Sequence, residues 1–103
     1  MDYLEPWVQC NLSDKKAAEK ELKIELSEVH VLYGLSLNAL ARRIDRDDVL
    51  FQLNEGTRNL VSVHLTYSGK KEENPQYPQI EEFASLDEWT TYAMMKDHEE
   101  YLR

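Results

Sequence analysis

Two segments of the chain carry apolar residues at helical spacing, one near each end. The first has an apolar residue every three or four positions, at Ala18, Leu22, Leu26 and Val29. This is the period of one helix face. Ser13 offers a hydroxyl that can cap the helix, and Asp14 suits its positive end. Residues 22–26 also alternate as a strand does, but Ala, Lys and Glu are strong helix formers, so we predict a helix over residues 14–27.

The second helical segment has the clearest start signal in the sequence. Ser85 and Glu88 match the Ser-x-x-Glu capping box, in which two side chains satisfy backbone N–H groups at a helix start. The apolar stripe and its flanks then comprise Leu86, Trp89, Thr90, Ala93 and Met94. We predict a helix over residues 86–97 and a frayed tail over residues 98–103.

Between these helices apolar residues alternate with polar ones, which is the pattern of half-buried strands. Strands are predicted over residues 35–44, 49–53 and 60–67, with a short edge strand over residues 80–83. Gly34 can adopt the positive φ that interrupts the apolar region before them. Asp45–Asp48 and Asn54–Gly56 are typical of turns, so the three longer strands form an antiparallel meander.

Each predicted strand of the meander has an apolar face. On the later two strands this face consists of Val49, Phe51, Leu53, Val61, Val63, Leu65 and Tyr67. The predicted fold class is α+β: a two-layer sandwich in which a meander of three or four strands carries the N-terminal and C-terminal helices on one face. The opposite face would be open and would carry Asn38, Arg42, Leu50, Gln52, Ser62, His64 and Thr66.

Two segments lie outside this alternation. Residues 1–12 predict an irregular or short extended arm whose apolar side chains cover one edge of the core: Tyr3, Leu4, Trp7, Val8 and Leu12. Trp7 is either a core residue or a contact for a partner, since tryptophan is enriched at both kinds of site. Ser68–Gln79 contains a glycine and two prolines and is the one long loop of the chain.

Composition and charge narrow the class of protein. The chain has 103 residues, which fits a single domain, and its 42% apolar residues suffice for one core. The formal net charge is -8, and the acidic excess lies in residues 1–31 and 69–103. A nucleic-acid partner is excluded because phosphate binding needs clustered Lys and Arg. A membrane is excluded because no apolar run approaches the length of a spanning helix.

None of the strong catalytic motifs is present: no phosphate-binding glycine loop, Cys-x-x-Cys, His-Glu-x-x-His or Gly-x-Ser-x-Gly. His30, His64 and His98 lack metal-ligand spacing, so no metal or other cofactor is expected. Cys10 has no partner for an intrachain disulfide and no local base, which favours a small packing role. The first residues lack the pattern of a signal peptide, so the expected location is the cytoplasm.

The most suggestive polar constellation lies on the predicted meander. Adjacent strands could gather eight polar residues on one face and its rim: Arg42, Arg43, Asp45, Asp47, Asp48, His64, Thr66 and Tyr67. A site would centre on Arg42, Arg43, Asp48, His64 and Tyr67. An acid, a base and an anion clamp drawn from them would support a small enzyme or a ligand-binding protein. The competing interpretation is structural, because acidic residues stabilise turns and pair with neighbouring arginines. It is the stronger one, so an enzyme is the alternative hypothesis.

Several short segments resemble a group of small, stand-alone bacterial α+β proteins without an assigned activity. The resemblance spans about residues 22–100 and rests on Asp47–Phe51, Val63–Gly69, the Pro75-x-Tyr77-Pro78 loop, and Trp89 with Asp97–His98. It implies no catalytic residue. In size and acidity the chain is also similar to immunity proteins that bind and neutralise a toxin, which is an analogy and not a motif match.

The leading hypothesis is therefore a protein-binding module, with immunity or antitoxin proteins as its nearest analogy. Its acidic ends would steer a basic protein partner at long range. The predicted contact surface combines the open sheet face with the long loop and comprises Arg42, Arg43, Asp48, His64, Thr66, Tyr67, Glu72, Glu73 and Tyr77.

Overall fold

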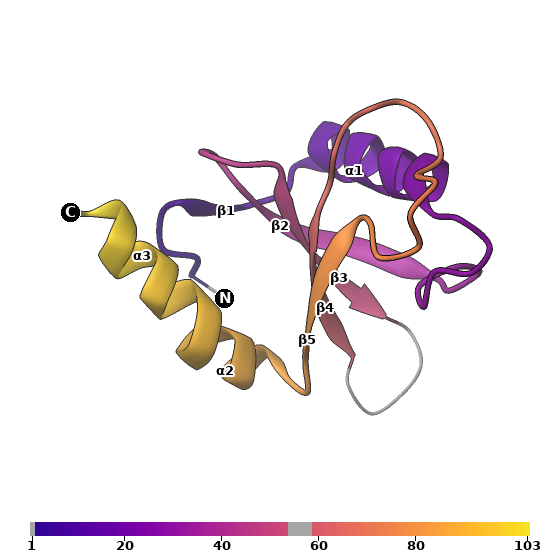
Figure 1. Ribbon diagram of the computed structural model, residues 1–103. Helices are drawn as coiled ribbons and strands as arrows, with labels where there is room; N and C mark the ends of the chain where they lie inside the picture. Colours follow the sequence, from indigo (N-terminus) through magenta and orange to yellow (C-terminus); the bar gives the residue numbers. More distant parts are fainter. Residues whose placement is uncertain (1, 54–58) are drawn as a thin grey trace.

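The alternating segments pair into one antiparallel sheet, and helical segments cover it on both sides (Figure 1). The computed structural model describes residues 2–53 and 59–103. Its elements in chain order are β1 (Trp7–Gln9), α1 (Leu12–Glu25), β2 (Leu37–Arg43), β3 (Asp48–Leu53), β4 (Leu60–His64), β5 (Gln79–Phe83), α2 (Leu86–Trp89), η1 (Thr90–Met94) and α3 (Met95–Tyr101). The last three follow one another without a break, and η1 is a π-helical turn. We call them together the C-terminal helix.

The sheet has five strands in the order β1-β2-β3-β4-β5, each antiparallel to the next. The predicted meander of β2, β3 and β4 is confirmed, as is the edge strand near residues 80–83. The expectation of three or four strands is corrected, because part of the N-terminal arm pairs with β2 as β1. The predicted turn at Asn54–Gly56 lies outside the described residues.

The two faces of the sheet carry separate apolar cores. One lies under α1 and comprises Ala18, Leu22, Leu26, Leu32, Ala39, Val49, Phe51, Val61, Val63 and Leu65. The other lies under the C-terminal helix and comprises Trp7, Ala41, Leu50, Leu60, Phe83, Trp89 and Met94. We call these surfaces the α1 face and the C-terminal face.

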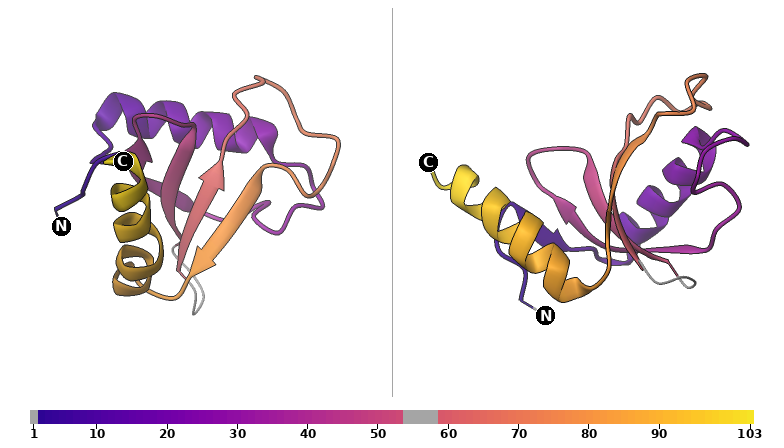
Figure 2. Two further views of the ribbon diagram at one scale, coloured as in Figure 1. Left: turned by 60° about the vertical axis from the view of Figure 1, so that its left-hand side comes forward. Right: turned by 60° about the horizontal axis from the view of Figure 1, so that its bottom comes forward.

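The prediction that both helices pack on one face is therefore wrong. Neighbouring residues Leu50 and Phe51 of β3 belong to different cores, and Figure 2 shows the sheet between α1 and the C-terminal helix. The physical reason is that β3 and β4 carry apolar residues on both faces. Leu50 and Leu60 are almost completely buried against the side that the alternation assigned to solvent.

An irregularity in β2 also moves side chains between the faces. Ala39 pairs with Phe51, but Ala41 pairs with Leu50, so the register shifts between Ala39 and Ala41. An extra residue of this kind is a β-bulge and reverses the in-and-out order along the strand. Ala39 consequently lies in the core under α1, and Ala41 lies in the core under the C-terminal helix.

Helix α1 begins and ends two residues earlier than predicted. Asn11, not Ser13, is the cap: its Oδ1 accepts a hydrogen bond from the Asp14 backbone N at 2.7 Å, and the Asp14 carboxylate accepts one from the Asn11 N. Because the helix ends at Glu25, Val29 does not lie on its stripe and is 73% exposed. The first three stripe positions are buried as expected.

The C-terminal helix begins as predicted and continues further. Ser85 Oγ accepts a hydrogen bond from Glu88 N at 3.1 Å, which confirms the cap. The helix runs to Tyr101, so residues 98–101 are helical instead of a frayed tail. His98 Nδ1 lies 2.6 Å from the Glu5 carbonyl oxygen, and this contact ties the helix to the N-terminal arm.

Leu12, which the sequence predicted to cover the core as part of the N-terminal arm, is exposed.

Candidate functional site

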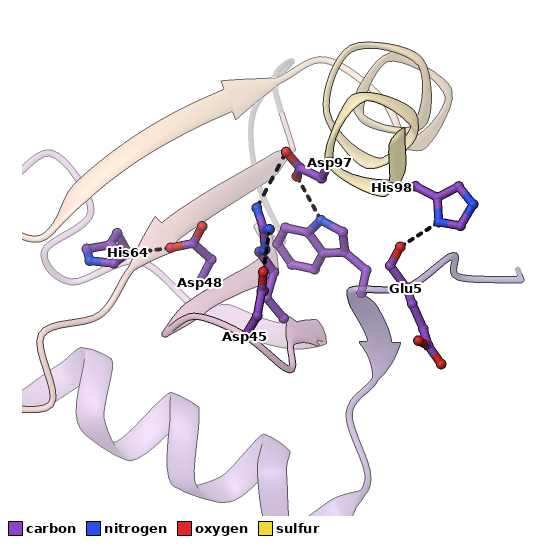
Figure 3. A network of polar contacts seen from close by, with 8 residues as sticks. Glu5, Asp45, Asp48, His64, Asp97 and His98 are labelled. Atoms are coloured by element: carbon purple, nitrogen blue, oxygen red, sulfur yellow. Dashed lines mark hydrogen bonds and ion pairs between the residues drawn. The ribbon is translucent and has the colours of Figure 1, made fainter. Parts of the chain in front are cut away.

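On the C-terminal face, a buried arginine joins three distant parts of the chain (Figure 3). Arg43, at the end of β2, is 7% exposed, and its Nε and Nη2 donate to the Asp45 carboxylate at 2.8 and 2.9 Å. Its Nη1 lies 3.4 Å from Asp97 Oδ1 in α3. Trp7 Nε1 donates to the other oxygen of Asp97 at 2.9 Å. The arm, β2 and the C-terminal helix therefore share one polar network.

The charges in this network satisfy one another. Burial lowers the pKa of Arg43, but its hydrogen bonds to the Asp45 carboxylate and the charge of Asp97 raise it more, so the net shift is upward. The same hydrogen bonds lower the pKa of Asp45. A guanidinium engaged by two carboxylates has little capacity to clamp a further anion. Arg43 is thus placed to hold the fold together.

Beside this network an aspartate and a histidine face each other across two strands. Asp48 in β3 and His64 in β4 are register partners, and His64 Nδ1 lies 2.5 Å from Asp48 Oδ1. The Asp48 side chain is 18% exposed and that of His64 is 55% exposed. A carboxylate that fixes one ring nitrogen leaves the other nitrogen available to solvent. This pair could transfer a proton to or from a bound group.

Two hollows of about 210 Å³ each adjoin this pair. Both are lined by Asp48, Ser62 and Glu81, so we treat them as one polar groove. One end also reaches His64 and Gln79, and the other reaches the C-terminal helix at Tyr92, Lys96 and Asp97. Ligand pockets usually enclose about 300–1,000 Å³, so each hollow is small for a substrate.

The sequence-predicted constellation is divided by the sheet. Arg43, Asp48 and His64 line the polar groove. Arg42 lies on the α1 face, where its Nε is 3.1 Å from Asp14 Oδ2. Tyr67 does not line the polar groove, and its backbone N–H donates to Glu25 at the end of α1. The bulge in β2 and the end of β4 at His64 account for this division.

The remaining predicted contact residues lie in the loop after β4. Thr66 Oγ1 donates to Glu72 Oε1 at 2.7 Å, so the two side chains are engaged with each other. Glu73 is exposed, and Tyr77 is 41% exposed. The loop returns to the fold through Glu72, whose backbone N donates to the Glu25 carbonyl oxygen at 3.0 Å.

A buried carboxyl group that sequence reasoning missed fixes this loop. Glu25, the last residue of α1, is fully buried and accepts hydrogen bonds from the backbone N of Thr66 and of Tyr67, each at 2.9 Å. Burial raises its pKa to about 7, and a side-chain hydrogen bond with Glu21 adds to the increase. Tyr67 has a φ of 51°, in the left-handed region. The only sequence signal was the place of Glu25 beside Leu26 on the apolar stripe.

The segment between α1 and β2 exposes apolar side chains in alternation. Val29, Val31, Tyr33 and Leu35 are 73%, 69%, 51% and 38% exposed, and we call residues 29–35 the apolar segment. Two residues between them, His30 and Leu32, are buried. His30 Nε2 lies 3.0 Å from the Pro78 carbonyl oxygen, and its Nδ1 accepts from Leu32 N at 3.0 Å. The backbone of the segment is therefore anchored while its other side chains face solvent.

A groove runs along each side of the apolar segment. One, of about 660 Å³, lies between residues 33–38 and α1. The other, of about 640 Å³, lies between residues 29–31 and the chain from Pro75 into β5, where Ile80 and Glu82 line it. The apolar segment thus lies next to β5, a neighbour that the sequence pattern did not indicate.

Comparison with known proteins found no matching family model, no matching curated protein and no matching solved structure.

Among the described residues, no group of three or more His, Cys, Asp and Glu side chains could hold a metal ion. Burial raises the pKa of the Cys10 thiol to about 11, which disfavours the reactive thiolate at neutral pH. None of the helices in the described part of the chain is long and apolar enough to cross a membrane.

Proposed function

We propose that the protein is a protein-binding module whose contact surface is the apolar segment with the neighbouring strand β5. The observation that carries the proposal is the exposure of four large apolar side chains within seven consecutive residues. Exposed apolar side chains are unfavourable in water, and a cluster of them marks an interaction site in a monomeric protein. The open sheet face predicted from the sequence is not part of this contact surface, because α1 packs on one face of the sheet and the C-terminal helix packs on the other.

Anchoring of the segment supports a binding role. Because His30 and Leu32 hold the backbone, the exposed Val31 and Tyr33 are presented in a fixed arrangement. A preformed surface loses less conformational entropy when a partner docks than a flexible one does. This distinguishes the apolar segment from isolated exposed residues such as Leu102 near the C-terminus.

Charge supports a basic partner. The chain has a formal net charge of -8, and Glu81 and Glu82 are both exposed on β5 beside the apolar segment. An acidic field accelerates the approach of a basic protein, and the effect weakens as salt screens it. The proposed role is protein binding. An immunity-type role would be one form of it, suggested by the size and charge of the chain.

The test is affinity capture from the native host followed by measurement with the purified partner. The variants are Val31→Asp in the apolar segment and Leu102→Asp as the matched control, since the two side chains are equally exposed at 69%. We expect Val31→Asp to weaken binding by about tenfold or more and Leu102→Asp to leave it unchanged. Equal affinity of both variants for the partner would refute the proposed surface.

Salt dependence tests the charge of the partner. Association should slow markedly between low and physiological salt, whereas dissociation should change less. The pair of reversals Glu81→Lys and Glu82→Lys should lower the association rate without unfolding the domain. Association that is independent of salt would contradict the basic partner and would leave the apolar contact standing.

A second candidate function is a small enzyme or ligand-binding protein that uses the polar groove. The bond between Asp48 and His64 favours it, because it fixes an exposed imidazole next to Ser62 and Glu81. Proton transfer by such a group contributes about 10²–10⁴ in rate. In this alternative His64→Ala abolishes activity and Val31→Asp has no effect, which is the reverse of what the binding proposal expects.

A further inference from the structure

Strand β5 ends the sheet, and this leaves backbone groups without a strand partner. It pairs with β4 on one side, and among residues 2–53 and 59–103 no strand pairs with its other side. In an antiparallel edge strand, alternate residues direct their N–H and C=O groups away from the sheet. Such an edge can accept one further strand from another chain.

The two sides of β5 differ in chemistry. Ile80 and Glu82 lie on the α1 face and line the groove of about 640 Å³ beside Val29 and Val31. Gln79 and Glu81 lie on the C-terminal face and line the polar groove together with Asp48, and Gln79 and Ile80 border both grooves. A strand added at this edge would direct alternate side chains toward Val29, Val31 and Ile80 on one face, where Glu82 adds a carboxylate, and toward Asp48 and Glu81 on the other.

We propose that β5 binds an extended segment of the partner by strand addition, and that this segment alternates apolar and basic residues. The inference rests on the proposed function and specifies how the partner is recognised. Backbone hydrogen bonds to the edge supply part of the affinity, and the two grooves supply the specificity. Apolar residues pack on Val29, Val31 and Ile80, and basic residues approach Glu81 and Asp48.

The same charges argue against a second copy of this chain as the occupant. If two β5 strands paired, Glu81 and Glu82 of each copy would approach the acidic edge of the other, and like charges opposite one another destabilise a strand pair. Acidic side chains at a sheet edge protect it from self-association. A basic strand turns this repulsion into attraction.

The experiment uses synthetic peptides, so it needs no identified partner. The probe is a seven-residue peptide of alternating Val and Lys. One control has the same composition in blocks, and a second is the alternating peptide with alternate backbone nitrogens methylated. Binding is followed by the backbone amide signals of the isotope-labelled protein in NMR titrations. We expect the alternating peptide to shift the signals of residues 79–83 and 29–31, and each control peptide to bind about tenfold more weakly or worse.

Two substitutions test the two sides of the strand separately. Val31→Lys should weaken binding of the alternating peptide through the apolar groove, and Glu81→Lys should weaken it through the polar side. Leu102→Lys and Glu99→Lys are the matched controls, because both positions are exposed near the chain end. We expect the controls to bind the peptide as the wild type does.

The outcomes separate this inference from the proposed function. If the methylated and unmethylated peptides bind equally, or if the signals of residues 79–83 do not move, strand addition is refuted. The proposed function then still stands if the captured partner distinguishes Val31→Asp from Leu102→Asp. If the partner does not distinguish them, the proposed function fails independently of the peptide result.

Discussion

The two faces of the sheet are built by different means. Under α1, the core consists of aliphatic residues and Phe51, supplied mainly by α1 and strands β2, β3 and β4 with regular periodicity. On the C-terminal face, Trp7 and Trp89 meet edge to face, with ring centroids 5.1 Å apart and planes at 85°. Tyr3 adds a second edge contact to Trp89 at 5.9 Å. The first face depends on local pattern, and the second depends on the two ends of the chain coming together.

This difference determines where each face is vulnerable. The α1 face distributes its burial over ten side chains, so each contributes a moderate share. The C-terminal face combines its apolar residues with two indoles and one ion-paired arginine, and the bond from Trp7 to Asp97 links residues 90 positions apart. Loss of one of these groups should release both chain ends, whereas loss of one aliphatic group should not.

The largest effect is expected at Trp89. Trp89→Ala should lower the free energy of unfolding by about 3–5 kcal/mol, because it removes a fully buried indole and its contacts with Trp7 and Tyr3. Tyr92→Ala is the control on the same helix, since Tyr92 is 70% exposed. Denaturant unfolding of both variants measures the difference. A Trp89→Ala protein as stable as the control would show that the C-terminal face is not a core.

A double substitution across the sheet tests whether the two faces are independent. Leu22→Ala should cost about 2–5 kcal/mol on the α1 face. Combined with Trp89→Ala, its effect should add within about 0.5 kcal/mol, because the two side chains pack in separate cores. A coupling free energy well above this value in the same unfolding measurements would show one shared core.

The α1 face also carries the pH dependence expected from Glu25. The pKa of Glu25 is about 7 in the folded protein and 4.5 ordinarily. Between pH 4.5 and pH 7, the folded chain therefore keeps a proton on Glu25 that the unfolded chain has released. The free energy of unfolding should therefore fall as the pH rises from 4.5 to 7, by up to roughly 3 kcal/mol. Glu25→Gln should flatten this slope. If the free energy of unfolding of the wild type rises with pH in this window relative to that of Glu25→Gln, the raised pKa of Glu25 is contradicted.

A smaller loss is expected at Asp97 on the opposite face. Asp97→Ala removes the ion pair with Arg43 and the hydrogen bond from Trp7 Nε1, and it should cost about 1–3 kcal/mol. Glu99→Ala, exposed on the same helix, is the control. Near-ultraviolet circular dichroism should show a change around the indoles only for Asp97→Ala. Equal stability of the two variants would mean that the network does not tie the chain ends together.

The smallest effects are expected at the helix starts. Asn11→Ala should cost about 1 kcal/mol, because Asn11 caps α1, and Ser13→Ala should change little. Ser85→Ala should also cost about 1 kcal/mol through the cap of the C-terminal helix. Thermal unfolding of the three variants checks the order. A larger loss for Ser13→Ala than for Asn11→Ala would overturn the observed start of α1.

Local sequence signals predicted where the helices and strands lie better than they predicted which face of the sheet each helix covers. The capping residue Ser85, the meander and the buried stripe at Ala18, Leu22 and Leu26 follow from short-range pattern, and all three are confirmed. The prediction that both helices pack on one face failed. Alternation along a strand indicates a solvent-exposed face only when the residues on that face are polar. Leu50 is apolar on the face predicted to be open and shares a core with Trp89, whereas Phe51 belongs to the core under α1.

The candidate site was partly predictable for the same reason. Asp48 and His64 were brought together by correct pairing of β3 with β4. Arg42 was misplaced because the bulge in β2 cannot be read from the sequence pattern. The exposed apolar segment was missed because Val29 was assigned to the helix stripe, although α1 ends at Glu25.

The most direct test of the account is amide hydrogen exchange of the protein alone and in complex with its purified partner. If the apolar segment and β5 form the contact surface, residues 29–35 and 79–83 should gain protection in the complex, and Arg43 and His64 should change little. Protection confined to Arg43 and His64, with residues 29–35 and 79–83 unchanged, would contradict this contact surface.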